Sequence, residues 1–363
     1  MDFTYSDEQA MLRESVDRFG SEQWNAADRV KRMRDPDAVA RSWAQMAELG
    51  WLMLPIAEAD GGLGGSAVDV MAVVEGFGRH LIPAPYVSSC VLVPALIGGD
   101  PAAAQVLEAI GSGGARAAAG LIEADGGYAL DHVATRAEGD RLTGAKLHVE
   151  DGGDADWFVV SARSAGAVDD AEGIGLYLVP HDADGLSIER FRAIDGHRHA
   201  RLTLNGVQGI VVGDPDAALP RISAAVDRAI AAHLAEAVGS IDAANAATLD
   251  YLKTRQQFGV TIGSFQVLQH RAVDMAVAAE EARAMLYHAT LNLDRVGAAR
   301  AVAAAKTRVG QTGLYVTRQA VQLHGGVGTS EELIVSHHLR RQMMLDLAHG
   351  PSDHHRDRFA RAA

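Results

Sequence analysis

The spacing of apolar residues changes twice along the chain and divides it into three regions. Up to about residue 117, apolar positions recur every three or four residues, as in amphipathic helices. Ser6 with Gln9 three positions later predicts a helix start with a capping box, and Gly50 predicts a helix end. Besides the helix that begins at Ser6, the predicted helices of this region cover residues 42–49, 68–77 and 102–110.

Between residues 118 and 214 the pattern changes to short apolar runs separated by Gly, Asp and Asn turn signals. Short strands with almost no helical periodicity favour a small antiparallel barrel or sandwich. The predicted strands cover residues 142–149, 157–162, 174–179, 187–191 and 200–204.

From residue 215 onward the chain is predicted to be helical again. Apolar residues from Ile222 to Ile241 step by three and four and form one stripe of a long helix. Residues 259–263 interrupt the pattern, and three more helices are predicted from residue 264, over 298–323 and over 335–348. We therefore expect three domains: an N-terminal helical domain (1–117), a middle antiparallel β domain (118–214) and a C-terminal four-helix bundle (215–363).

Charge and cysteine content exclude several classes of protein. The 363 residues include 33 Lys and Arg against 47 Asp and Glu, a formal charge of −14, which argues against nucleic acid or an anionic membrane as partner. The single Cys90 cannot form an internal disulfide, as in reducing compartments. We see no secretory signal and no apolar run near the roughly 18 residues that span a bilayer, so we expect a cytoplasmic protein.

The 15 histidines do not predict a metal site. Two adjacent pairs, 337–338 and 354–355, lie in predicted helical or terminal segments. Neighbouring side chains on a helix point about 100° apart and chelate one ion poorly.

Two stretches carry candidate chemistry. In residues 251–266, Arg255 can contact a phosphate with two donors and Phe258 can lie against an aromatic ring. Alternatively, Arg255 is a helix C-terminal charge and Phe258 packs locally. In residues 322–328, Gly325 and Gly326 allow close approach of a pyrophosphate to the backbone, or simply end a helix.

In this order and separation, the two stretches resemble the acyl-CoA dehydrogenase family of flavoproteins. The resemblance covers essentially the whole chain, and its closest group is the small subunits of pimeloyl-CoA dehydrogenase. Further matching segments are Met1–Phe3 with Glu8–Gln9, residues 48–51, 60–62 and 75–79. For the closest group they are 235–239, 250–255, 264–272 and 353–355, two of which overlap the first stretch.

The resemblance implies a cofactor, FAD, and an oligomer with a dimer as its smallest unit. Arg255, Phe258 and Gln266 match residues that contact FAD from the neighbouring subunit. Gln322 and the glycines at 325 and 326 (Gly325, Gly326) match the loop that holds the ADP part of FAD. FAD would then bridge two copies of the chain, or this chain and a larger homologous subunit.

The reaction that the resemblance implies is α,β-desaturation of an acyl-CoA thioester, with electrons passed to an electron-transferring flavoprotein. A base takes the α-proton while the β-hydrogen leaves as hydride to the flavin. The position of the family's catalytic glutamate falls on His349 here, and the position used by other members falls on Ala229, with Asp227 as the nearest carboxylate. Three interpretations follow: His349 is the base, Asp227 is the base, or a larger partner subunit supplies it.

The strand region also departs from the family pattern. Ile122 stands in the family's Thr-Glu-Pro stretch, and His148 and Glu150 stand in its Trp-x-Thr stretch, which normally contact the flavin ring. The ADP end of the site is therefore better matched than the ring end. Two alternatives to an active dehydrogenase subunit follow: a non-catalytic subunit that completes a partner's FAD site, and an acyl-CoA oxidase-like enzyme.

Overall fold

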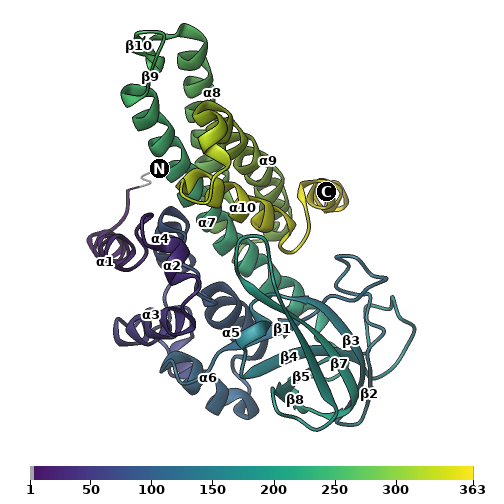
Figure 1. Cartoon of the computed structure of the whole chain (residues 1–363). Coiled ribbons are helices and arrows are strands. Elements are labelled where there is room, and N and C mark those ends of the chain that lie inside the picture. Colours follow the sequence, from purple (N-terminus) through teal and green to yellow (C-terminus); the bar gives the residue numbers. More distant parts are fainter. Residues whose placement is uncertain (1–3, 363) are drawn as a thin grey trace. The chain divides into compact units, whose positions relative to one another are not determined.

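A computed structural model describes residues 4–362, and the chain falls into two compact units (Figure 1). One unit combines the residues up to 39 with 67–83 and the residues from 230 onward; the other comprises 40–66 and 84–229. The first unit thus brings N-terminal helices together with the C-terminal ones. The matching segment Met1–Phe3 lies outside the described residues.

The helical starts of the first unit follow the predicted local chemistry. The first helix, α1 (Asp7–Gln23), begins with the predicted capping box: the Gln9 amide donates to Ser6 Oγ at 3.3 Å, and the Ser6 amide donates to Gln9 Oε1 at 3.1 Å. Each side chain satisfies a backbone donor that the first turn leaves without an intrahelical partner. The short α2 (Arg29–Arg32) and the longer α4 (Ala67–His80) follow in the same unit.

Helix α4 meets the long helix α7 (Leu219–Thr254) through glycines on both sides. A Cβ atom on Gly78 would lie 1.8 Å from the carbonyl oxygen of Glu236, and one on Gly239 would lie 1.9 Å from that of Glu75. Only hydrogen atoms fit into such gaps, so the two backbones touch directly. The glycine at each position is therefore required by helix packing.

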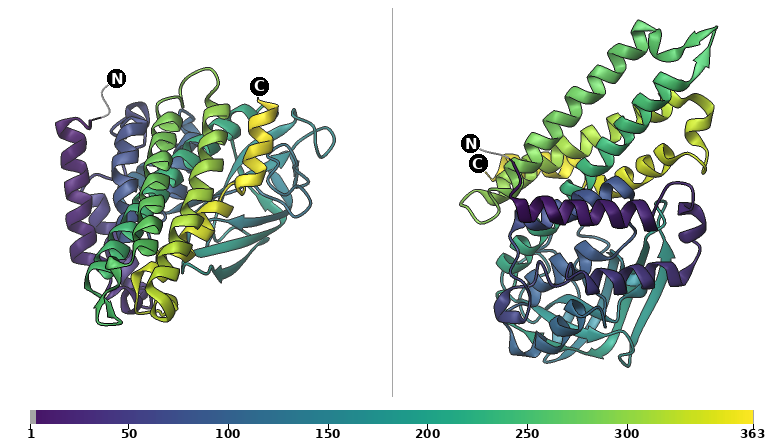
Figure 2. Two further views of the ribbon diagram at one scale, coloured as in Figure 1. Left: turned by 90° about the horizontal axis from the view of Figure 1, so that it is seen from above. Right: turned by 90° about the vertical axis from the view of Figure 1, so that its left-hand side faces the viewer.

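The C-terminal part contains the four predicted long helices and one that was not predicted. Helices α8 and α9 lie side by side in both views of Figure 2. The additional helix α11 was missed because it is short and polar, and only Ser352 and His355 in it are buried. The helices after α7 are α8 (Gln266–Thr290), α9 (Ala298–His324), α10 (Ile334–Leu347) and α11 (Ser352–Arg361).

The predicted interruption after α7 is a small hairpin. Strands β9 (Gln256–Gln257) and β10 (Val260–Thr261) pair in antiparallel fashion around Phe258 and Gly259. Both turn residues have positive φ, +55° and +80°, as two-residue hairpin turns require. Three 3₁₀ residues (Ile262–Ser264) then lead into α8.

The second unit joins short helices to one sheet. A π-helical segment (Val87–Leu92) continues into α5 (Val93–Ile97), and the sequence pattern missed both. Because every residue of the π-helical segment is buried, it lacks the alternation of polar and apolar positions that marks a helix. The other α-helices with residues in this unit are α3 (Pro36–Glu48), α6 (Ala104–Gly111) and the beginning of α7.

The sheet has eight strands in the order β6-β7-β3-β2-β4-β5-β8, with β1 beside β4. Most strand pairs are antiparallel, as predicted, but two are not, because β1 and β2 both run parallel to β4. All five predicted strands are present. The strands are β1 (Ala117–Gly120), β2 (Arg136–Glu138), β3 (Arg141–Val149), β4 (Trp157–Arg163), β5 (Ile174–Pro180), β6 (Leu186–Arg192), β7 (Arg198–Gln208) and β8 (Ile210–Val212).

The predicted order of helical, β and helical regions is confirmed. Within residues 4–362, none of the helices has the length and apolar character needed to cross a bilayer.

Candidate functional site

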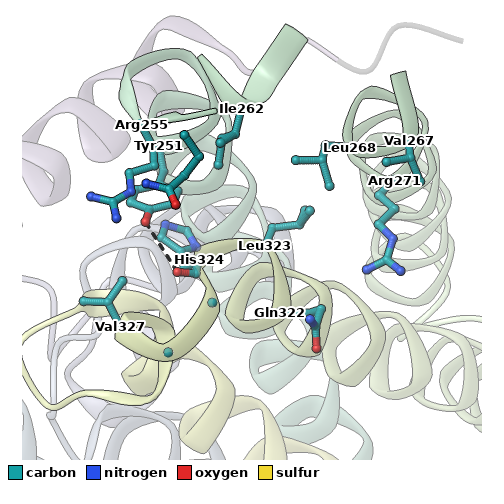
Figure 3. Close-up of a pocket in the computed structure, with 13 residues that line it drawn as sticks. Tyr251, Arg255, Ile262, Val267, Leu268, Arg271, Gln322, Leu323, His324 and Val327 are labelled. Carbon is teal, nitrogen blue, oxygen red and sulfur yellow. Dashed lines mark hydrogen bonds between the residues drawn. The ribbon is translucent and has the colours of Figure 1, made fainter. Parts of the chain in front are cut away.

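A cavity of about 510 Å³ opens in the first unit between the end of α7, the start of α8 and the end of α9 (Figure 3). Four of the six residues predicted to bind a cofactor line it: Arg255, Gln322, Gly325 and Gly326. Arg255 is more than sixty positions from the other three residues in sequence, so the fold brings the two predicted stretches together in one site.

Phe258 and Gln266 do not line this cavity. Phe258 lies at the tip of the hairpin with its side chain 91% exposed, and its ring packs edge-on against that of Phe265, with centroids 6.2 Å apart. Gln266 is the exposed first residue of α8. Their predicted role was contact with FAD from a neighbouring subunit, and that role stays a prediction.

The two glycines leave open space at the end of α9. Gly325 has φ +67° and ψ −150°, a conformation that favours glycine. Gly326 has no such restriction, and a Cβ there would meet no atom within 4 Å. Neither packing nor backbone strain within the described chain therefore explains the glycine at 326.

Two aromatic rings form one wall of the cavity, and neither was predicted as a site residue. The rings of Tyr251 and His324 are stacked, with centroids 4.3 Å apart and an angle of 29°. Tyr251 Oη also donates to the His324 carbonyl at 3.4 Å (Figure 3). The sequence signal for both was their place inside the two stretches, but only the fold brings them together.

A hydrogen bond within α9 determines the tautomer of His324. Its Nδ1 lies 2.8 Å from the carbonyl of Ala320, so Nδ1 carries the proton and Nε2 remains an acceptor. Burial lowers the pKa of His324, and the hydrogen bond to Ala320 opposes this only in part. The ring is therefore neutral at pH 7.

Two arginine side chains line the cavity. Arg255 follows directly after α7, and Arg271 projects from α8 on the other side of the cavity (Figure 3). Among the lining residues, all within the described part of the chain, none is acidic. Two guanidinium groups without a carboxylate favour an anionic ligand such as a phosphate ester.

His349, the first candidate base, lies just beyond α10 in a left-handed backbone conformation with φ +55°. Its side chain is half-buried, and its ring centroid lies 5.6 Å from that of His233 on α7. Its carbonyl accepts a hydrogen bond of 2.9 Å from Nε2 of His355 on α11. The structure thus holds His349 from two helices.

Asp227, the alternative base, lies on α7 and is only 6% exposed. It precedes His233 by six residues, about 240° of helical rotation, so the two side chains leave α7 in different directions. The roles of Asp227 and of His349 as alternative bases both stay predictions.

A buried ion pair next to His233 was missed by the sequence reasoning. Arg341 on α10 donates to Glu236 on α7 through two bonds, Nε to Oε1 at 2.6 Å and Nη2 to Oε2 at 2.8 Å. His233 Nδ1 lies 3.7 Å from Glu236 Oε2. Burial raises the pKa of Glu236, but the charge and hydrogen bonds of Arg341, with His233 nearby, outweigh it and give a pKa of about 2.

In the second unit, a buried ion pair lies beside residues that depart from the family pattern. Lys146 Nζ donates to Glu123 Oε1 at 2.6 Å and to Ser161 Oγ at 3.0 Å. Burial lowers the pKa of Lys146 to about 8, against the opposing charge of Glu123. The carbonyl of Ile122 accepts a backbone hydrogen bond from Leu147 of β3 at 2.7 Å.

Comparison with known proteins gives matches along almost the whole chain. The family profile described as acyl-CoA dehydrogenase, N-terminal domain, matches residues 6–114; the middle-domain profile matches 118–207 and the C-terminal-domain profile matches 220–363. The probable acyl-CoA dehydrogenase FadE25 of Mycobacterium tuberculosis (strain ATCC 25618 / H37Rv) is 30% identical over 335 residues, covering 86% of this chain and 84% of that protein.

Solved structures agree in fold. A variant of the Tcur3481-Tcur3483 steroid ACAD superposes with a TM-score of 0.88 at 25% identity, covering 98% of this chain and 97% of that one. Butyryl-CoA dehydrogenase from Megasphaera elsdenii also gives 0.88, at 22% identity, with 100% and 99% covered. The latter likeness is one of fold alone.

Proposed function

Because this chain belongs to the acyl-CoA dehydrogenase family, oxidoreductases that act on CH–CH groups, we propose that it binds FAD and takes part in the α,β-desaturation of an acyl-CoA thioester. Electrons then pass to an electron-transferring flavoprotein. We place the reaction in the cytoplasm. A dicarboxylic acyl-CoA such as pimeloyl-CoA is the substrate that the closest resembling group favours.

The cavity at the end of α9 is the observation that carries the proposal. Its volume of about 510 Å³, its two guanidinium groups and its open glycine at 326 fit the ADP part of FAD. Arg255 would neutralise the pyrophosphate, Gln322 would hydrogen-bond to it, and the Tyr251–His324 stack offers an aromatic face. When bound, FAD supplies the acceptor for the β-hydride.

Flavin occupancy of the purified protein tests this assignment. Arg255→Ala removes the charge and should lower the ratio of flavin absorbance to protein absorbance, whereas Arg255→Lys should retain part of it. Lys253→Ala is the matched control, because Lys253 is an exposed cation on the same helix and does not line the cavity. Full flavin occupancy in Arg255→Ala would refute the phosphate contact.

Within this chain, we propose His349 as the group that takes the α-proton. A neutral imidazole accepts a proton at pH 7, and His349 stands where the family carries its glutamate. Asp227 is the second candidate; it is buried on a different side of α7 from His233. Loss of reduction of the bound flavin by acyl-CoA in His349→Gln but not in Asp227→Asn supports His349, and the reverse pattern supports Asp227.

A second candidate function is that of a non-catalytic subunit, which completes the FAD site of a larger homologous partner. The absence of the family's glutamate at position 349 favours it, and the paired name of the Tcur3481-Tcur3483 steroid ACAD supports a two-chain assembly. The exposed Phe258 and Gln266 would then reach FAD held mainly by the partner. The same two residues would serve a homodimer.

Purified protein separates these functions. A yellow preparation that bleaches with acyl-CoA under argon supports an active dehydrogenase subunit. A colourless preparation that gains flavin only with a second chain supports the non-catalytic subunit. An oxidase-like enzyme would instead be recognised by rapid reoxidation of its reduced flavin in air.

A further inference from the structure

A second histidine lies beside His349 and is more deeply buried than His349 itself. His233 on α7 is 2% exposed, and its ring centroid is 5.6 Å from that of His349, with 38° between the ring planes. Both histidines belong to the first compact unit. Rings at this distance restrict each other's orientation.

An ionised carboxylate, that of Glu236, lies close to His233. Its Nδ1 lies 3.7 Å from Glu236 Oε2, one helical turn further along α7. Arg341 holds the same carboxylate with two hydrogen bonds, of 2.6 and 2.8 Å. This geometry places Nδ1 of His233 toward the anion, so the other ring nitrogen, Nε2, faces away from it.

The backbone of His349 is also fixed. The last turn of α10 is capped by Lys306 of α9, whose Nζ donates to the carbonyls of Leu345 and Asp346. His355 of α11 donates to the carbonyl of His349 at 2.9 Å. A non-glycine residue at φ +55° is uncommon, and here neighbouring helices hold it in that conformation.

We propose that His233 is the positioning residue for His349, and that Glu236 acts through it. The inference rests on the proposed function of His349 as the acceptor of the α-proton. A glutamate base becomes neutral when it takes a proton, whereas an imidazole becomes a cation. A half-buried cation needs a nearby anion or acceptor, and the ring of His233, backed by Glu236, lies where it can orient His349 and share the added charge.

The step balances within the named groups. The α-carbon–hydrogen bond of the thioester breaks, its electron pair remains on carbon, and the proton forms a new N–H bond on His349. His233 makes no bond to substrate. Its role is to set the ring orientation and to stabilise the imidazolium that results.

Proton removal can be measured separately from hydride transfer. A 3-thiaacyl-CoA such as 3-thiabutanoyl-CoA carries sulfur at the β position, which blocks hydride loss and makes the α-hydrogens acidic. Exchange of these hydrogens in D₂O, followed by proton NMR with the purified protein, therefore reports the base alone. The ¹⁵N chemical shifts of the labelled imidazoles report the tautomer and hydrogen bonding of His349.

Four variants test the inference. His233→Phe keeps ring size and burial without ring nitrogens and should slow exchange about 100-fold, with unchanged affinity for the 3-thiaacyl-CoA and shifted imidazole signals of His349. His233→Gln, which keeps polar atoms, should recover part of the rate and also serves if the Phe variant does not fold. His338→Phe is the control, because His338 is a buried histidine whose Nδ1 contacts Ser240 instead. His349→Gln tests the base itself.

The outcomes separate the inference from the proposed function. If His349→Gln abolishes exchange and His233→Phe slows it while His338→Phe does not, the positioning role is supported. If His349→Gln abolishes exchange but both His233 variants keep the wild-type rate and imidazole shifts, the positioning role is overturned and the base stands. If His349→Gln leaves exchange unchanged, the proposed base is wrong, and the inference fails with it.

Discussion

Replacement of Arg341 by methionine should cost more stability than any loss of packing explains. Arg341 is 6% exposed and Glu236 is 5% exposed, so the variant leaves a carboxylate in the interior without its cation. Breaking a buried ion pair by removing one partner costs about 3–5 kcal/mol. Methionine fills most of the space of the arginine stem, which keeps the cavity contribution small.

The pH dependence follows from the pKa of Glu236. Its folded pKa of about 2 lies below the ordinary value of 4.5. Its ionised form therefore stabilises the wild-type fold by about 3 kcal/mol above pH 4.5, and this is lost as the pH falls from about 4.5 toward about 2. In Arg341→Met, burial dominates and raises the pKa of Glu236, so the penalty is largest at neutral pH and is relieved on acidification.

Urea unfolding followed by circular dichroism at fixed protein concentration measures the difference in the free energy of unfolding between the wild type and Arg341→Met. We expect a difference of about 3–5 kcal/mol at pH 7 that is smaller at pH 5. The double variant Arg341→Met, Glu236→Met removes both charges and should recover most of the loss. A difference below about 1 kcal/mol, or one that does not change with pH, would contradict the buried pair as the cause.

Three further variants test packing and the cavity. Lys146→Met should lower the free energy of unfolding in urea by about 3–5 kcal/mol, because it strands the buried Glu123 carboxylate; a loss within about 1 kcal/mol would refute this. Gly78→Ala would place a Cβ 1.8 Å from the Glu236 carbonyl oxygen, so we expect a lower melting temperature in calorimetry, and an unchanged one would show that α4 and α7 can separate. Gly326→Leu should reduce flavin occupancy with little change in melting temperature, and retained flavin would argue that the ligand does not approach this residue.

Much of the fold was predictable because it depends on the spacing of residues close together in sequence. The capping box at Ser6, the long helices after residue 215 and the five main strands follow from spacing over a few residues. Val87–Ile97 was missed because burial on all sides removes the alternation that marks a helix. The strand Ala117–Gly120 was missed because alanine carries no strand signal, and its parallel pairing with β4 depends on distant chain segments.

The site was predictable in part for the same reason. Arg255 and Gly325 lie in short sequence motifs that can be recognised locally, and both line the same cavity in the structure. The stack of Tyr251 on His324 needs two helices in register, and the contact between Glu236 and Arg341 joins positions 105 residues apart. No local pattern reports such contacts, so the environment of His233 could be found only in the folded chain.

The direct contact between α4 and α7 restricts which substitutions this enzyme can accept. Gly78 lies against the Glu236 carbonyl, and Glu236 is one turn from His233 on the same helix. Any added atom at this crossing would shift the turn that carries both residues, so altered proton chemistry would accompany the packing defect. In laboratory evolution toward a new acyl group, we therefore expect lineages to retain Gly78 and Gly239 while the exposed loops diversify.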